Sequence, residues 1–158
     1  MSVHMQAPLE IGICVRDAAR AAAFYESVLG FQRISEATLA PDRAQLAGFG
    51  PVAFTMVRLQ TNYGERVKLL QPDPPPRDPP PRDGILGQAG IAYLTFVVGD
   101  LDAAYERLRA AGVKVLSAGP TQTRPGTRLL FFQDGEGNAL ELVQYDDLAS
   151  YRPDLRRT

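Results

Sequence analysis

Four ionisable residues stand at matching places in two similar stretches of the chain: Glu10, Lys68, Tyr93 and Glu141. Each lies in a short segment that alternates like a β-strand, on the face opposite to the aliphatic residues. Two carboxylates beside an ammonium and a phenol could transfer protons on a small organic substrate. An isolated strand of this kind would simply have a solvated polar face, but four matched positions favour a shared site.

Histidine and cysteine are almost absent, which excludes several common kinds of active site. The 158 residues include one histidine, His4, and one cysteine, Cys14. A zinc site of the Cys/His type needs three or four such ligands, and a Ser-His-Asp or Cys-His mechanism needs an anchored histidine, whereas His4 lies near the N-terminus. Cys14 lies within an apolar run, so we expect a buried, inert thiol. With no intramolecular disulfide possible, we also expect a reducing compartment.

The charges are nearly balanced, with 17 Lys and Arg against 18 Asp and Glu and a net charge of -1 at pH 7. Such a chain has no global basic field, so we expect neither nucleic acid nor a membrane as a partner. No stretch reaches the roughly 18 consecutive apolar residues of a membrane span, and residues 1–8 lack the pattern of a signal peptide. We therefore predict a cytoplasmic protein. The absence of a glycine-rich phosphate motif predicts that it has no cofactor.

A proline-rich segment, PDPPPRDPPPRD at 72–83, divides the chain into two halves. Proline cannot continue a helix or donate to a sheet ladder, so we expect an extended connector there. The predicted organisation is a first module at 9–71, a linker at 72–90, a second module at 91–145 and a C-terminal tail at 146–158.

Both modules show the pattern of a strand, a helix and three further strands, βαβββ, which predicts an α+β fold. In the first module we expect a helix at 18–29, capped by Asp17, and strands at 9–15, 31–35, 52–59 and 65–71. In the second we expect a helix at 101–111, capped by Asp100 or Asp102, and strands at 91–98, 113–116, 127–133 and 138–145. The stretch 37–50 has no counterpart in the second module and is a candidate lid or edge insertion.

Three motifs are similar to those of the vicinal oxygen chelate superfamily: VRDAARAAAFYESVLGF, VVGDLDAAYERLRAAGV and FFQDGEGNALELVQ. That superfamily includes glyoxalase I, bleomycin-resistance proteins, extradiol dioxygenases, fosfomycin-resistance enzymes and methylmalonyl-CoA epimerase. The resemblance covers 9–145 and implies two βαβββ modules forming a cup-shaped mixed sheet with helices on its outer face. It also implies a divalent metal held by one residue on each of the first, fourth, fifth and eighth strands.

Carried over from the flanking motifs, the four ligand positions of the family fall on Glu10, Lys68, Tyr93 and Glu141. Glu141 matches a usual ligand, and Glu10 is a chemically possible one. An ammonium and a protonated phenol are poor metal ligands at neutral pH. We therefore expect a site without metal, in which Glu10 and Glu141 would be the ligands if any ion were held.

Three functions stay open for this altered site. The first is metal-independent acid-base chemistry on a small metabolite, of the isomerase, epimerase, cyclase or lyase type, with Glu10, Lys68, Tyr93 and Glu141 as catalytic residues. The second is a non-catalytic drug- or metabolite-binding protein that confers self-resistance, and the third is a metal-dependent lyase or dioxygenase using Glu10 and Glu141.

Further residues are candidates for the walls of the cup. The substrate-binding candidates are Phe54, Met56, Tyr63, Leu129, Phe131 and Arg128. An acidic ligand could be bound by Arg58, Arg66, Arg124 and Arg128, although arginines at sheet edges are commonly just solvated. The stiff linker would let two chains exchange modules, so we expect a homodimer.

Overall fold

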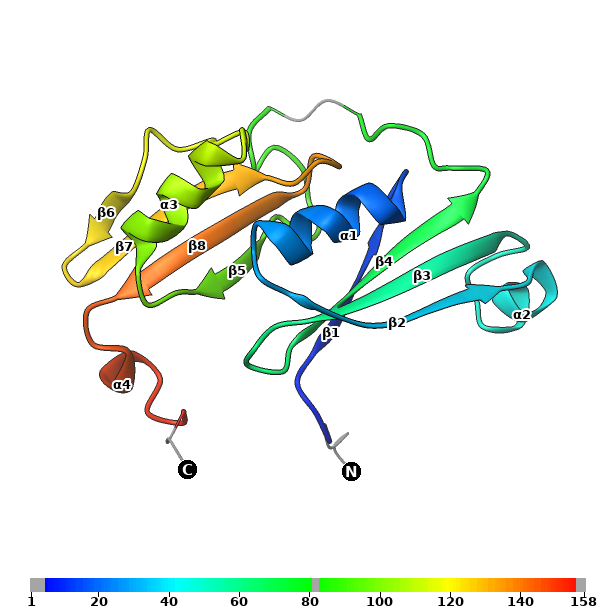
Figure 1. Ribbon diagram of the computed structural model, residues 1–158, viewed down its shortest axis with the longest axis horizontal. Coiled ribbons are helices and arrows are strands. Elements are labelled where there is room, and N and C mark those ends of the chain that lie inside the picture. Colours follow the sequence, from blue (N-terminus) through cyan, green and yellow to red (C-terminus); the bar gives the residue numbers. More distant parts are fainter. Residues whose placement is uncertain (1–4, 81–82, 156–158) are drawn as a thin grey trace. The chain divides into compact units, whose positions relative to one another are not determined.

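The computed structural model describes residues 5–80 and 83–155, and His4 lies outside them. The chain divides into two compact units, 1–80 and 81–158, and we describe each by itself (Figure 1). Each unit contains one βαβββ module. The boundary between the units falls within the proline-rich segment.

The first unit is a four-stranded mixed sheet with two helices. Its elements are β1 (Glu10–Cys14), α1 (Ala18–Ser27), β2 (Gln32–Leu39), α2 (Pro41–Leu46), β3 (Ala53–Gln60) and β4 (Arg66–Asp73). The strand order is β1-β4-β3-β2, with β1 parallel to β4 and the other pairs antiparallel. The candidate insertion at 37–50 forms the end of β2, the short helix α2 and the turn that follows it.

The second unit repeats this topology. Its elements are β5 (Leu94–Val97), α3 (Leu101–Ala110), β6 (Thr121–Arg124), β7 (Thr127–Gln133), β8 (Ala139–Tyr145) and α4 (Leu148–Tyr151). The strand order is β5-β8-β7-β6, and β5 runs parallel to β8. The predicted α+β class and the two βαβββ modules are therefore confirmed. A single cup formed by both modules stays a prediction.

The long helix of each unit covers the aliphatic face of its own sheet. In the first unit α1 contacts β3 and β4. Tyr25 of this helix is fully buried. In the second, Leu101 and Leu108 of α3 are buried, and α3 contacts β8. The buried residues on the helix-covered faces of the sheets are Ile13, Val57, Leu59, Val67 and Leu69 in the first unit and Leu130, Phe132, Leu140 and Leu142 in the second. The predicted strand alternation therefore separates core from polar face.

Both helices begin with the same pair of hydrogen bonds. The Asp17 carboxylate accepts from the backbone N–H of Arg20, and the side-chain oxygen of Gln71 accepts from the N–H of Ala18, at 2.9 and 2.8 Å. In the second unit, Asp100 accepts from Ala103 N–H at 2.9 Å and Gln144 accepts from Leu101 N–H at 2.8 Å. Each pair satisfies two N–H groups that have no partner within the helix.

Two strand predictions of the second unit were wrong. Residues 113–116 form only an isolated bridge, between Val115 and Phe132, because Leu116 and Ser117 both donate to the same carbonyl, that of Phe131, instead of forming a regular ladder. The fourth strand of the sheet is β6, which follows Gly119 and Pro120. β5 is also shorter than expected, so Tyr93 lies just before it.

The prediction of a buried Cys14 was also wrong, because its thiol is exposed. The side chains of β1 alternate between the two faces, and Ile13 in the strand and Val15 just after it are buried. Cys14 therefore lies on the same face as Glu10, which is the polar face of the sheet.

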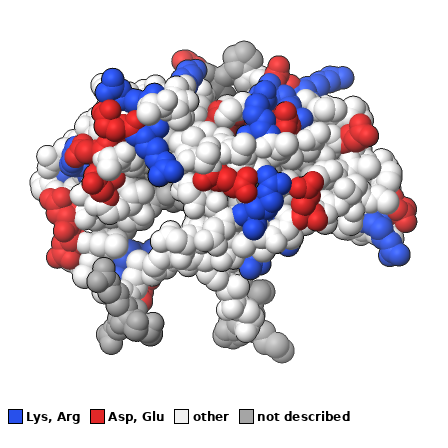
Figure 2. Space-filling model, in the orientation of Figure 1, with Lys and Arg blue, Asp and Glu red and all other residues white. Residues whose placement is uncertain are grey.

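No helix within the described residues is long and apolar enough to cross a membrane. On the face shown in Figure 2, acidic and basic side chains lie interspersed. This arrangement agrees with the near-zero net charge of the sequence.

Candidate functional site

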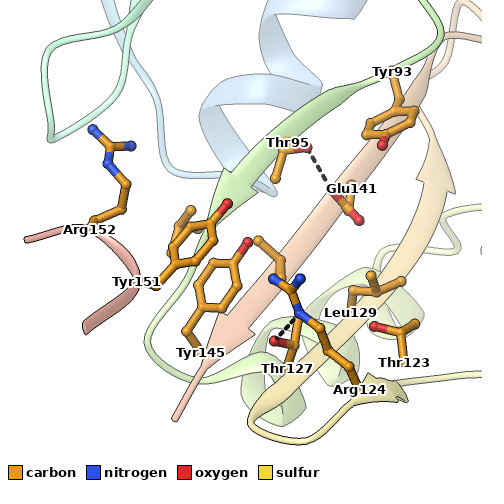
Figure 3. A pocket seen from close by; sticks show the side chains of 12 residues that line it. Tyr93, Thr95, Thr123, Arg124, Thr127, Leu129, Glu141, Tyr145, Tyr151 and Arg152 are labelled. Atoms are coloured by element: carbon orange, nitrogen blue, oxygen red, sulfur yellow. Dashed lines mark hydrogen bonds between the residues drawn. The ribbon is translucent and has the colours of Figure 1, made fainter. Parts of the chain in front are cut away.

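The polar face of the second sheet carries a pocket of about 610 Å³ (Figure 3). Side chains from one face of strands β5, β7 and β8 form its floor. On that face Thr95 of β5 lies opposite Glu141 of β8, because the two residues pair in register. Residues of β6 and α4 complete the lining. Its ionisable members are Tyr93, Arg124, Glu141, Tyr145, Tyr151 and Arg152.

Glu141 is the buried acid of this pocket, with 7% of the residue exposed. Its Oε2 accepts a hydrogen bond of 2.5 Å from the Thr95 hydroxyl (Figure 3). Within the described part of the chain, its other oxygen, Oε1, has no hydrogen-bond donor. A carboxylate held at one oxygen and open at the other can exchange a proton with a bound molecule.

Aromatic side chains form much of the remaining wall. The rings of Tyr145 and Tyr151 stack, with centroids 3.8 Å apart and planes inclined by 17°, and the rings of Tyr93 and Phe131 meet edge to face at 5.0 Å. Burial, together with the hydrogen bond to Tyr151, raises the pKa of Tyr145 to about 12. The Tyr145 phenol therefore stays protonated at neutral pH and serves as a hydrogen-bonding and stacking group.

Two arginines line the same pocket. Arg124 Nε donates to the Thr127 hydroxyl at 3.1 Å, and no carboxylate in the described residues forms an ion pair with Arg124. Arg152 is engaged by Asp154, with Nη2 2.6 Å from a carboxylate oxygen. Arg124 is therefore the cation best able to bind a negatively charged group of a ligand.

The polar face of the first sheet holds the other two predicted catalytic residues in a compact charge cluster. Glu10 Oε2 lies 3.2 Å from Lys68 Nζ and 3.8 Å from Arg58 Nε, and Glu10 Oε1 lies 3.2 Å from Arg66 Nη1. The Lys68 hydrogen bond is the main cause that lowers the pKa of the Glu10 carboxyl, with further lowering by Arg66 and Arg58. Glu10 is thus an ionised ion-pair partner.

The residues at the family's metal-ligand positions do not fit a divalent ion. In the first unit one position is the Lys68 ammonium, and the Glu10 carboxylate beside it is already paired with three cations. Another positive ion would be repelled there. Among residues 5–80 and 83–155, no group of three or more His, Cys, Asp or Glu side chains could hold a metal.

The structure places the six predicted wall residues at different kinds of position. Leu129 lines the pocket, and Phe131 packs beside it against Tyr93. Arg128 lies on the opposite face of β7, where its guanidinium donates two hydrogen bonds, of 2.8 and 2.7 Å, to Asp102 of α3. That ion pair lowers the pKa of the Asp102 carboxyl and raises that of Arg128.

In the first unit, Phe54 is buried, with its ring centroid 4.8 Å from that of Phe49. Met56 lies half-buried on the same strand, and Tyr63 is exposed at the turn between β3 and β4. Neither the second-unit pocket nor the Glu10 cluster includes any of these three predicted wall residues.

The sequence predicted one site formed by Glu10, Lys68, Tyr93 and Glu141. The structure brings Tyr93 together with Glu141 in the second unit and Glu10 together with Lys68 in the first, and a joint catalytic role for all four stays a prediction. The sequence analysis missed Thr95 and Tyr145 as site residues, although strand parity could have found both, since they share the face of Glu141. Tyr151 gave no signal, because it belongs to a one-turn helix beyond the predicted module.

Similarity to known proteins extends over most of the chain. Protein YwkD of Bacillus subtilis is 33% identical over 137 residues, which cover 85% of this chain and 93% of YwkD. A glyoxalase family protein from Bacillus cereus superposes with a TM-score of 0.77 at 20% identity, covering 90% of this chain and 96% of that one. The fosfomycin resistance protein FosX of Listeria monocytogenes, crystallised with Mn(II) and a sulfate ion, gives a TM-score of 0.60 at 15% identity, covering 89% and 93%.

These two structures share the fold. The sequence model of the Glyoxalase/Bleomycin resistance protein/Dioxygenase superfamily matches residues 7–142. Because the match spans well over half of the sequence, the chain belongs to that superfamily, as its motifs indicated.

Proposed function

We propose that the pocket of the second unit binds a small organic anion and that Glu141 moves a proton on it without a metal ion. The observation that carries this proposal is a buried carboxylate that lines the pocket and to which residues 5–80 and 83–155 donate a hydrogen bond at only one oxygen. Buried acids in ligand pockets are the usual general acids and bases. The expected reaction is of the isomerase, epimerase, cyclase or lyase type.

The charges of the pocket favour a ligand with a carboxylate or similar group. Arg124 can bind it, because the Thr127 contact uses only Nε and leaves the two terminal nitrogens of the guanidinium. A planar guanidinium binds a carboxylate through two parallel hydrogen bonds. The ligand would then be fixed at one end by Arg124 and would present its reacting carbon to Glu141.

Proton transfer from a carbon beside a carbonyl fits this arrangement. Glu141 Oε1 takes the proton, the electron pair of the C–H bond moves toward the carbonyl oxygen, and the enolate oxygen accepts a hydrogen bond from the Tyr93 hydroxyl. Protonation of the opposite face by solvent water would epimerise the carbon, with the abstracted proton then passing from Glu141 to solvent, and return of the proton from Glu141 to another atom would isomerise the molecule. Thr95 positions the carboxylate by holding Oε2.

A second candidate is a binding protein that performs no chemistry. The stacked rings of Tyr145 and Tyr151 favour it, because aromatic walls bind planar organic molecules by stacking and apolar burial. In that case Glu141 would select for a hydrogen-bond donor on the ligand.

Deuterium exchange separates the two functions without knowledge of the product. Pyruvate, 2-oxobutyrate and 2-oxoglutarate are incubated with the protein in deuterium oxide, and loss of the proton signal at the carbon beside the carbonyl is followed by NMR. We expect at least one of these probes to exchange faster with the protein present than in the same solution without it. Glu141→Gln should slow it by about 100-fold or more while changing the affinity less than about tenfold.

Glu106→Gln is the matched control, because it makes the same chemical change on the exposed side of α3, where Glu106 pairs with Arg109. Its exchange rate should equal that of the wild type. Saturable binding of a probe without exchange would favour the binding protein. Neither binding nor exchange with any of the three would reject this substrate class, and equal loss in both variants would reject the role of Glu141.

A further inference from the structure

The strand register of the first unit gathers three cations around one acid. Lys68 of β4 pairs in register with Gly12 on one side and with Arg58 of β3 on the other, while Arg66 pairs with Glu10 and Gln60. These positions have one parity, so their side chains share the polar face of the sheet. Like charges directly opposite each other destabilise a sheet, and Lys68 and Arg58 are such a pair.

Glu10 does not balance these charges. It lies within 4 Å of all three cations, yet one carboxylate against an ammonium and two guanidinium groups leaves an excess of two positive charges. Because the pKa of Glu10 is lowered by Lys68 first and then by the arginines, the carboxylate stays ionised through the neutral range and the excess stays the same.

The cluster is partly withdrawn from water. The exposed side-chain fractions are 31% for Glu10, 29% for Lys68, 27% for Arg58 and 37% for Arg66. Arg58 Nε is buried, and the described part of the chain supplies it with no hydrogen-bond acceptor. Buried donors nearly always form a hydrogen bond, whereas the Glu10 Oε2 atom lies 3.8 Å from this nitrogen, which is an ion-pair distance but too long for a hydrogen bond.

The other donors of the cluster are already oriented. Arg58 Nη1 donates to the Ser35 hydroxyl at 3.1 Å, and Arg66 Nε donates to Gln60 Oε1 at 2.7 Å. These bonds hold both guanidinium groups on the sheet face and leave further N–H groups for another acceptor. A preorganised set of donors loses little freedom on binding an anion.

We propose that Arg58, Arg66 and Lys68 form a binding site for an oxyanion with two negative charges, a phosphate or a dicarboxylate. Two negative charges match the excess of two positive charges in the cluster, and an anion with several oxygens can accept hydrogen bonds from more than one of its cations. The site consists of first-unit residues only, so it does not depend on the acid-base role of Glu141.

Thermal unfolding of the full chain with phosphate or succinate tests the site. Sodium chloride at equal ionic strength controls for general screening. A ligand that binds the folded state raises the midpoint in proportion to the logarithm of its concentration once that concentration exceeds the dissociation constant. We expect this dependence for phosphate, for succinate or for both, beyond the effect of sodium chloride, and the anion that shows it identifies the anion class.

Charge variants provide the decisive comparison. Lys68→Met and Arg66→Met should each weaken anion binding about tenfold or more, while Glu10→Gln should tighten it severalfold because it increases the positive excess. The matched control is Arg33→Met on β2, since Arg33 is 38% exposed but pairs with Glu26 and Glu36 at 3.0 Å each. Its anion affinity should stay within about twofold of the wild type.

The Lys68 and Arg66 variants are independent, so either one is sufficient if the other does not fold, as judged by circular dichroism. The proposal is overturned if chloride reproduces the shift at equal ionic strength. It is equally overturned if the folded Lys68 or Arg66 variant binds as the wild type does, or if neither anion raises the midpoint more than sodium chloride does.

Discussion

The reactivity we propose for Glu141 depends on the side chains that surround it. The same parity that places it on the polar face places Thr95 opposite it in β5 and Tyr145 four residues further along β8. A carboxylate there is buried, whereas Glu10 at the related position of the first unit is surrounded by cations. The two acids that looked equivalent in the sequence therefore have different surroundings and, in our proposals, different tasks.

The raised pKa of Tyr145 predicts how the stability of the protein changes at alkaline pH. Its pKa is about 12 in the folded protein because of burial and the Tyr151 hydrogen bond, against about 10 in an unfolded chain. Between these values the unfolded state loses the proton while the folded state keeps it, so the free energy of unfolding falls as pH rises from about 10 to about 12. Below pH 10 this contribution is fully present.

Urea unfolding at a series of alkaline pH values measures this effect. Tyr145→Phe removes the ionisable group, so its stability should fall less than that of the wild type across the window. Tyr63→Phe, at the exposed turn, is the control and should follow the wild type. Parallel curves for Tyr145→Phe and the wild type would show that Tyr145 does not titrate abnormally.

The starts and ends of the two long helices could be predicted from the sequence, because residues next to each helix determine them. Asp17 and Asp100 mark the starts of α1 and α3, and Gly30 and Gly112 follow their ends with φ of 77° and 66°, a conformation that favours glycine. The glutamines that complete the caps come from β4 and β8. Their role depends on tertiary packing, so the sequence showed only that ERVKLLQPD and NALELVQYD are alike.

The missed strand β6 has a similar explanation. Its four residues, TQTR, are polar and all exposed, so no hydrophobic pattern marked them. The apolar segment 113–116 instead looked like a strand. The Pro125–Gly126 pair is a turn signal that joins β6 to β7, with Arg124 and Thr127 paired across it. This turn signal, just before the predicted strand at 127–133, indicates that β6 precedes it at the edge of the sheet.

The repeated caps lead to a stability prediction for these elements. Asp100→Ala should lower the free energy of unfolding by about 1 kcal/mol, as loss of an N-cap usually does, and Asp17→Ala should cost a similar amount. Gln144→Leu should cost about as much, because the N–H of Leu101 loses its acceptor. Urea denaturation measures each variant.

Glu106→Ala on the exposed face of α3 is the control for these variants and should change stability by less than about 0.5 kcal/mol. If Gln144→Leu proved as neutral as this control, the strand-to-helix hydrogen bond would not contribute to stability. The cap would then depend on the aspartate alone.

For the whole molecule, the sequence predicted two modules and the four positions where this family has its metal ligands. It could not predict the number of cations around Glu10, because Arg58 and Arg66 reach that acid only through the register of three strands. A homodimer and a cytoplasmic location stay predictions. Light scattering after gel filtration tests the dimer, which requires twice the 17.2 kDa of one chain.

The positive charges around Glu10 also predict that the protein binds divalent metal ions poorly. With Lys68, Arg58 and Arg66 paired to Glu10, the first unit offers a divalent cation a surplus of positive charge at the position of a family ligand. We therefore expect protein purified without chelator to contain well under one divalent ion per chain by elemental analysis. Dialysis against EDTA should leave the deuterium exchange rate unchanged, and added Mn²⁺ should not increase it. Stoichiometric iron, manganese, nickel or zinc that EDTA removes together with activity would instead favour the alternative of a metal-dependent lyase or dioxygenase.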